Sequence, residues 1–201
     1  IFIFSAFQIN VTWAQEEDES MQISSEDRLT GLEPSFGMNF HPNSDNFYSE
    51  KALSAGNHWI RYNGLFWSEV QPDGNITDPS QWNWDYDLKL NNMLVDANEK
   101  GMEVILIIRS TPDWAKENPE DPSCGPMGSE HINDFATFMH EVVKHYSADP
   151  YYVKYYQIWN EPDAPYELVQ GGSSAPYGCW GDPEDDYFGG GYYAEVLKAV
   201  Y

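Results

Sequence analysis

Short apolar runs and amphipathic segments alternate along the chain from about residue 36 to residue 201. Runs of strand length are bounded by Gly, Pro, Asn and Asp, and longer segments carry apolar residues at helical spacing. The predicted strands are residues 36–41, 58–62, 102–109 and a run ending at Asn160, and the predicted helices are residues 48–55, 84–100, 132–146 and 192–201. The pattern predicts four successive strand–helix units.

The order of these elements restricts the fold class. Residues 102–109 are almost continuously apolar, which is typical of a strand buried on both faces of a parallel sheet. Strands that alternate with helices predict βαβ units, and these form either a doubly wound sheet or a (β/α)8 barrel. Long loops follow the strands and short turns precede them, which favours the barrel. No Gly-rich phosphate loop follows the first strand, which disfavours a dinucleotide-binding domain.

A complete barrel needs about 250 residues. The sequence therefore predicts an α/β fold, a (β/α)8 TIM barrel truncated to about its first four β/α units over residues 35–201.

Composition narrows the classes of partner. Hydrophobic residues make up 41% of the chain and aromatic residues 16%, as expected for a globular protein. Ten basic residues against 33 acidic residues give a formal charge of −23. Such a surface repels phosphate backbones and anionic headgroups, so we expect neither nucleic acid nor a membrane surface as partner.

The first residues indicate export. Residues 1–14 contain an apolar run followed by small residues at positions 12 and 14, as in the remnant of a secretory signal peptide. The run is too short to span a bilayer. Residues 15–34 are polar and acidic and are predicted to form a flexible leader. The expected location is secreted, extracellular or periplasmic.

One short stretch carries candidate chemistry. The predicted fourth strand ends in Ile158-Trp159-Asn160-Glu161-Pro162, so that a carboxyl group stands at a strand tip beside an amide and an indole. This arrangement suits acid/base chemistry on a sugar, although a strand that ends in a solvated turn would give the same letters.

With the strands placed, residues 35–201 resemble the N-terminal half of a catalytic domain of glycoside hydrolase clan A, of the family 39 or family 5 type. The most specific element is the Asn160-Glu161 pair after the fourth strand. Supporting elements are Trp59-Ile60-Arg61 in the second strand, Thr111-Pro112-Asp113-Trp114 after the third, and the helix start 191–197. The resemblance implies an O-glycosyl hydrolase that retains anomeric configuration and acts on a poly- or oligosaccharide.

The resemblance also implies roles for individual residues. Glu161 would be the acid/base, since retaining hydrolysis uses one carboxyl as nucleophile and a second as acid and then base. Asn160 would bind the sugar 2-hydroxyl, and Trp159 would supply apolar surroundings at the substrate. Arg61 would steady the nucleophile, although an ordinary rim ion pair is an equal alternative.

Further substrate contacts are expected from His41 at the end of the first strand and from Trp114 as a stacking platform, with Trp67 as a weaker candidate. A structural histidine and core tryptophans are the competing interpretations. Clan members carry the nucleophile after the seventh strand, so we expect it beyond residue 201 and expect these residues alone to be inactive. A non-catalytic carbohydrate-binding barrel is the alternative function.

Cys124 and Cys179 fall in the loops after the third and fourth strands, on one face of the predicted barrel, where either a disulfide or two free thiols would fit. The acidic loops lack the ligand spacing of a calcium-binding EF-hand, and we expect neither a metal nor a cofactor. The sequence leaves the oligomeric state open.

Overall fold

The computed structural model describes residues 36–40, 49–118, 120–168 and 177–201. The predicted signal peptide (1–14), the predicted leader (15–34) and His41 lie outside these residues, and their predictions stay untested.

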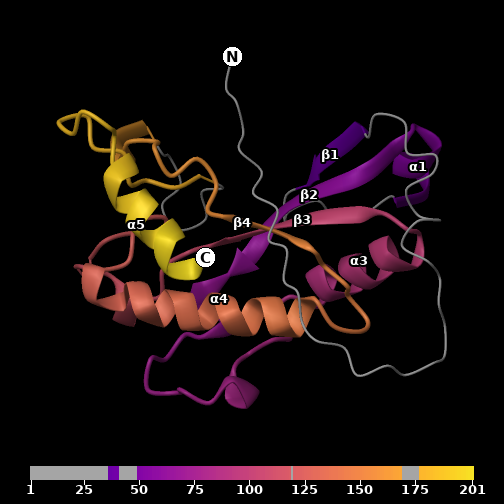
Figure 1. Cartoon of the computed structure of the whole chain (residues 1–201), viewed down its shortest axis with the longest axis horizontal. Coiled ribbons are helices and arrows are strands. Elements are labelled where there is room, and N and C mark those ends of the chain that lie inside the picture. Colours follow the sequence, from indigo (N-terminus) through magenta and orange to yellow (C-terminus); the bar gives the residue numbers. More distant parts are fainter. Residues whose placement is uncertain (1–35, 41–48, 119, 169–176) are drawn as a thin grey trace.

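The described residues contain four strands, each followed by helical structure (Figure 1). The elements in chain order are β1 (Phe36–Phe40), α1 (Ser49–Ser54), β2 (Asn57–Phe66), α2 (Trp67–Val70), α3 (Leu88–Glu99), β3 (Glu103–Arg109), α4 (Ile132–Tyr146), β4 (Tyr155–Ile158) and α5 (Gly190–Val200), with short 3-10 turns η1 (Pro79–Gln81), η2 (Asp113–Ala115), η3 (Ser129–His131) and η4 (Tyr166–Leu168).

The four strands form one parallel sheet in the order β1-β2-β3-β4. Each strand therefore lies beside its predecessor in the chain. A doubly wound sheet reverses its strand order at a switch point, and no such reversal occurs among the described strands. The parallel order confirms the predicted α/β class and the barrel-type succession of units.

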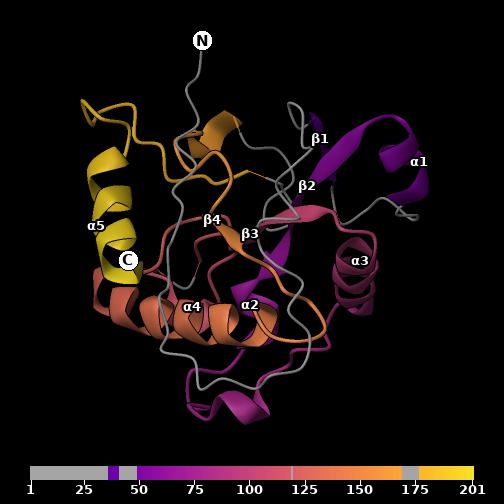
Figure 2. The ribbon, with the colours of Figure 1, turned by 45° about the vertical axis from the view of Figure 1, so that its right-hand side comes forward.

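Helices cover one face of the sheet. Figures 1 and 2 both place α3 and α4 along the same side of the strands, with α5 packed against α4. The side chains that face these helices are buried in one continuous core: Ile60, Tyr62, Val104, Leu106 and Ile108 from the strands, and Leu90, Leu94, Phe135, Phe138 and Val142 from the helices. Each such side chain stabilises the fold by roughly 1.5–3 kcal/mol.

The opposite face of the sheet is more polar and less buried in the amino-terminal half of the strands. Trp59 and Arg61 on β2, Ile105 on β3, and Tyr155 and Gln157 on β4 are only half-buried. Since alternate side chains of a strand point to opposite faces, these residues share the face that would line a barrel interior.

The largest differences from the predicted bounds occur at the end of β2 and at the start of α3. β2 continues through Phe66 into α2, whereas a loop was expected from Asn63. Helix α3 begins at Leu88 rather than at Trp84, because the Asp87 side chain accepts hydrogen bonds from the backbone N–H groups of Lys89 and Leu90 and so caps the helix there.

The loops are distributed unevenly between the two edges of the sheet. At the amino edge, where strands begin, the connections from helix to strand are residues 55–56, 100–102 and 147–154. At the carboxyl edge, where strands end, the segments between β2 and α3, β3 and α4, and β4 and α5 are residues 67–87, 110–131 and 159–189. This asymmetry confirms the predicted one, and it places the candidate site at the carboxyl edge.

Candidate active site at the carboxyl edge

The turn after β4 has an unusual backbone. Trp159 and Glu161 have positive φ angles of 61° and 46°, a conformation that residues other than Gly adopt rarely. Surrounding hydrogen bonds hold the turn: the Trp159 N–H donates to the Ile108 carbonyl at 2.8 Å, and the Gln157 side-chain amide donates to the Trp159 carbonyl at 2.7 Å. Strained residues persist only where neighbouring groups over-determine them. The turn places Asn160 inside, 5% exposed, and leaves Glu161 exposed.

Arg61 lies in the middle of β2, not near its end as predicted, and its side chain bonds residues of β1 and β4 and the turn after β4. Its Nη2 donates to Asn160 Oδ1 at 2.7 Å, its Nε to Gln157 Oε1 at 2.9 Å, and its Nη1 to Asn39 Oδ1 at 3.1 Å. Partial burial lowers the pKa of the guanidinium, and the negative charge of Glu161 opposes that shift. Arg61, Asn160 and Glu161, which the sequence analysis selected separately, therefore form one group.

The polar partners Asn39 and Gln157 were missed by the sequence analysis. Both are amides within strands, and Asn39 lies opposite Arg61 in the register of β1 and β2. The period-2 alternation of a strand could have placed Gln157 on the face of Tyr155.

A buried arginine was also missed. Arg109, at the end of β3, is 3% exposed, donates from Nε to Asn63 Oδ1 at 2.9 Å, and lies 4.3 Å from the centroid of the Phe66 ring. Burial lowers its pKa to about 10. The sequence could have indicated this residue, because an arginine that ends an apolar strand is rarely buried unless it is paired.

The prediction that Trp159 lies at the substrate is corrected. Its side chain is fully buried, its Nε1 donates to the Cys124 carbonyl at 3.2 Å, and its ring packs against Phe135 and Trp180. Strand alternation would place Trp159 on the face of Gln157. The positive φ at Trp159 breaks that alternation, and the indole enters the core beside the helix-facing residues.

The expectation for Trp67 is corrected in the same way, since it is fully buried in α2. Trp114 is half-buried rather than open. Its Nε1 donates to the Gln71 carbonyl at 3.0 Å, and its ring packs edge-on against Trp67 and against His131. The structure thus places Trp114 against the β2–α3 loop and not with the Arg61–Asn160–Glu161 group.

Two loops support the turn after β4. Cys124 and Cys179 form a disulfide with their Cα atoms 5.4 Å apart, which joins the β3–α4 loop to the β4–α5 loop. The Cys124 carbonyl accepts hydrogen bonds from the Cys179 N–H and from the indoles of Trp159 and Trp180. Beside it, the Gly178 N–H donates to the Asn160 carbonyl at 2.6 Å. The disulfide region therefore contacts the candidate site directly.

The described residues hold no cluster of three or more side chains suited to a metal ion. Among the same residues, none of the helices has both the length and the apolar character needed to cross a bilayer.

Comparison with known proteins shows the fold of this chain but no sequence family. No family model matches the chain, and no curated protein matches it. Among solved structures, a family 39 glycoside hydrolase from Bacteroides cellulosilyticus WH2 is 24% identical, with a TM-score of 0.51, over 82% of this chain and 28% of that chain.

Two further structures are more distant. A beta-galactosidase from the psychrophilic Marinomonas ef1 has a TM-score of 0.43 and 19% identity over 63% of this chain and 22% of its own. A xylanase B from Clostridium stercorarium F9 has a TM-score of 0.42 and 16% identity over 82% of this chain and 47% of its own.

The likeness to the family 39 structure defines the class of fold: four β/α units of a glycosidase-like barrel. The chain spans less than a third of the length of that structure. Activity, substrate and partners are therefore matters for proposal.

Proposed function

We propose that this chain is the N-terminal half of the catalytic barrel of a retaining glycoside hydrolase, with Glu161 as acid/base. The observation that carries the proposal is the group at the tip of β4: Arg61 bonded to Asn160, and the Glu161 carboxyl beside them, on a glycosidase-like fold. Active sites of such barrels lie at the carboxyl ends of the strands.

The mechanism requires a second carboxylate, which we place beyond residue 201 at the end of the seventh strand. That carboxylate attacks the anomeric carbon while Glu161 donates its proton to the departing glycosidic oxygen. In the second step Glu161, now a carboxylate, removes a proton from a water molecule whose oxygen displaces the nucleophile. The anomeric configuration is retained.

Asn160 and Arg61 have distinct parts in this mechanism. Because Arg61 Nη2 donates to Asn160 Oδ1, the orientation of the amide is fixed, and Asn160 Nδ2 is the atom that would donate to the sugar 2-hydroxyl. That contact strengthens as positive charge develops at the anomeric carbon. Arg61 is a positioning residue for Asn160.

The disulfide supports a further part of the proposal, that the protein is exported, since disulfides persist in oxidising compartments. The partner that we propose is a poly- or oligosaccharide.

The test is Glu161→Gln in the whole protein that carries this chain. Turnover of natural, unactivated glycosides should fall by about 10²–10⁴-fold, the usual contribution of a general acid. Aryl glycosides with good leaving groups should still form the glycosyl-enzyme, because they need little protonation.

The matched control is Asp163→Asn, which removes another exposed carboxylate two residues away and should leave turnover unchanged. Normal cleavage of a natural glycan by Glu161→Gln would refute the acid/base role. A whole protein without a carboxylate at the end of its seventh strand would instead favour the carbohydrate-binding barrel.

A further inference from the structure

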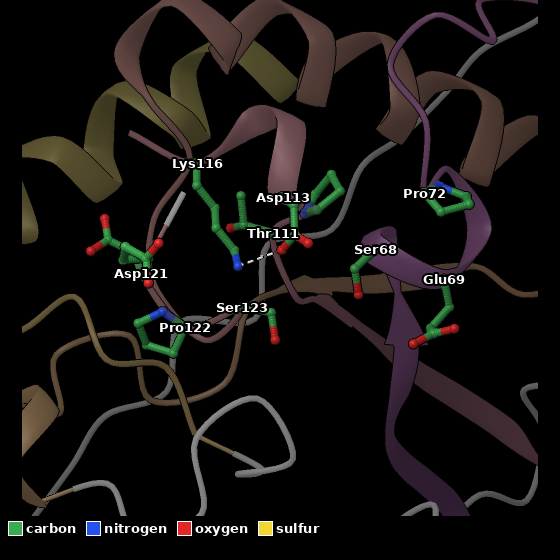
Figure 3. A pocket seen from close by; sticks show the side chains of 11 residues that line it. Ser68, Glu69, Pro72, Thr111, Asp113, Lys116, Asp121, Pro122 and Ser123 are labelled. Carbon is green, nitrogen blue, oxygen red and sulfur yellow. Dashed lines mark hydrogen bonds and ion pairs between the residues drawn. The ribbon is translucent and has the colours of Figure 1, made fainter. Parts of the chain in front are cut away.

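A cavity of about 510 Å³ opens between the loops that follow β2 and β3 (Figure 3). One wall comes from α2 and the residues after it, and the other from the loop after Thr111. The lining residues are Ser68, Glu69, Pro72, Thr111, Pro112, Asp113, Lys116, Glu120, Asp121, Pro122 and Ser123. Its volume lies within the range of about 300–1,000 Å³ typical of small-molecule sites.

Hydrogen bonds between the loops hold the walls in place. Ser68 is bonded to Ser110 twice, between the two hydroxyls at 2.8 Å and from its N–H to the Ser110 carbonyl at 3.0 Å. Thr111 donates its N–H to the Ser123 carbonyl at 2.8 Å and its hydroxyl to the Gly125 carbonyl at 2.6 Å. The cavity is therefore formed before any ligand arrives, which lowers the entropic cost of binding.

The lining favours one class of ligand. Four carboxylates and the Lys116 ammonium give the cavity a formal charge of −3, so an anionic ligand is repelled. The Lys116 side chain is only 7% exposed and bonds Asp113 Oδ1 at 2.6 Å, which leaves the outer carboxylates as the main acceptors. Carboxylates and hydroxyls match the hydroxyl groups of a sugar, and the rings of three prolines offer apolar surface to its C–H groups.

The cavity is connected to the candidate active site through neighbouring loops. Ser123 precedes Cys124, which is bonded to Cys179, and Gly178 holds the Asn160 carbonyl. In the sheet, β3 lies between β2 and β4. Glu161 follows β4 and the cavity lies between the loops after β2 and β3, so both lie at the carboxyl edge of the sheet.

We propose that this cavity is a subsite for a neutral sugar unit of an extended oligosaccharide whose scissile bond lies at Glu161. The inference rests on the proposed glycosidase function. It implies that the substrate is a chain of several uncharged sugars, and that uronic acid or sulfated units are rejected at this position.

The experiment uses the substitution Glu69→Trp in the whole protein, so that the indole fills the cavity. Glu69 is an exposed residue of α2, where a larger side chain can be accommodated. The probes are neutral tetrasaccharides of glucose, of xylose and of galactose, the matching aryl monoglycosides, and a tetrasaccharide of galacturonic acid. For the neutral sugar that the protein prefers, the ratio of kcat/KM on the tetrasaccharide to kcat/KM on the monoglycoside should fall about tenfold.

The matched control is Glu50→Trp, which makes the same change at an exposed position of α1 and should leave the ratio unchanged. Glu69→Gln should narrow the preference for the neutral over the uronic tetrasaccharide, because it removes one repelling charge. An unchanged ratio in Glu69→Trp, or a galacturonic tetrasaccharide cleaved in preference to neutral ones by the unmodified protein, would overturn the subsite.

A separate readout covers the case in which the unmodified protein cleaves none of the probes, which would count against the proposed function. Calorimetry then compares the binding of the neutral tetrasaccharides by the unmodified protein and by Glu69→Trp. Weaker binding by the variant supports the subsite independently of catalysis. Equal binding, or none, overturns it.

Discussion

The two edges of the sheet differ in how their loops are held. At the amino edge the turns are short and close by backbone bonds, such as that from Met102 N–H to the Ala97 carbonyl. At the carboxyl edge the loops are long and are joined to one another by a disulfide and by side chain to backbone bonds. Non-glycine residues with positive φ gather mainly at the carboxyl edge and its loops: Ser110, Trp159, Glu161 and Phe188 there, against Tyr152 at the amino edge.

This difference between the two edges predicts which substitutions change activity as well as stability. Residues in sparsely populated backbone conformations cost about 1–3 kcal/mol each, and they recur at functional sites where surrounding structure holds them. A change at the carboxyl edge should therefore alter stability and activity together. A change at the amino edge should alter stability alone.

The largest effect is expected from removal of the cross-link between the carboxyl-edge loops by the double substitution Cys124→Ser and Cys179→Ser. The bond closes a sequence separation of 55 residues, so its loss should lower the free energy of unfolding by about 4 kcal/mol through the added entropy of the unfolded chain. Turnover should also fall, because Gly178 and Asn160 lose their support.

Urea denaturation and kinetics on an aryl glycoside measure the two effects. A reducing agent should destabilise the unmodified protein by a similar amount and leave the double variant unaffected. A loss of less than about 1 kcal/mol would show that the cross-link contributes little to the carboxyl edge.

A smaller effect is expected from glycines at the two edges. A Cβ on Gly178 would lie 2.6 Å from the Pro162 Cα and 2.9 Å from the Trp159 ring, so Gly178→Ala must displace the turn that holds Asn160 and Glu161. We expect a loss of about 1–3 kcal/mol of stability together with reduced turnover.

The amino-edge counterpart is Gly101→Ala, where a Cβ meets nothing within 4 Å but φ is +68°. It should cost about 1–2 kcal/mol through backbone strain alone, with turnover unchanged. Thermal unfolding and kcat of both variants test the comparison, and equal losses of activity would contradict it.

The sequence predicted the parts of this arrangement that follow from periodicity. The apolar runs identified all four strands, and parallel strands bring their ends to one edge, so the loops after the strands were expected together. The contact between Arg61 and Asn160 was not predicted, because Arg61 lies in the middle of β2 and reaches Asn160 only through its long side chain. The extension of β2 through Asn63-Gly64 was missed because that polar and flexible pair is typical of a turn.

The aromatic residues could not be placed by the same reasoning. Trp159 was expected at the substrate, but its position depends on a positive φ that a residue other than Gly seldom adopts and that no sequence pattern indicates. Trp67 and Trp114 follow strands at the carboxyl edge, although Trp67 begins α2 and does not lie in a loop as predicted. Their burial depends on contacts with α4 and with the β2–α3 loop, which are set by tertiary packing.

The smallest effect is expected from an ion pair at the amino edge. Lys154 Nζ lies 2.7 Å from Glu103 Oε1, with the two side chains 49% and 27% exposed. Exposed pairs of this kind contribute about 0.2–1 kcal/mol, because water and salt screen the charges and two long side chains lose freedom. A double-mutant cycle with Lys154→Ala and Glu103→Ala should give a coupling energy in that range. The coupling should shrink at about 1 M salt, where the screening length is about 3 Å.

Turnover should be the same in all four proteins of the cycle, since the pair lies at the opposite edge from Glu161. A coupling above about 2 kcal/mol, or a loss of turnover in either single variant after correction for stability, would show that the amino edge is not confined to a structural role.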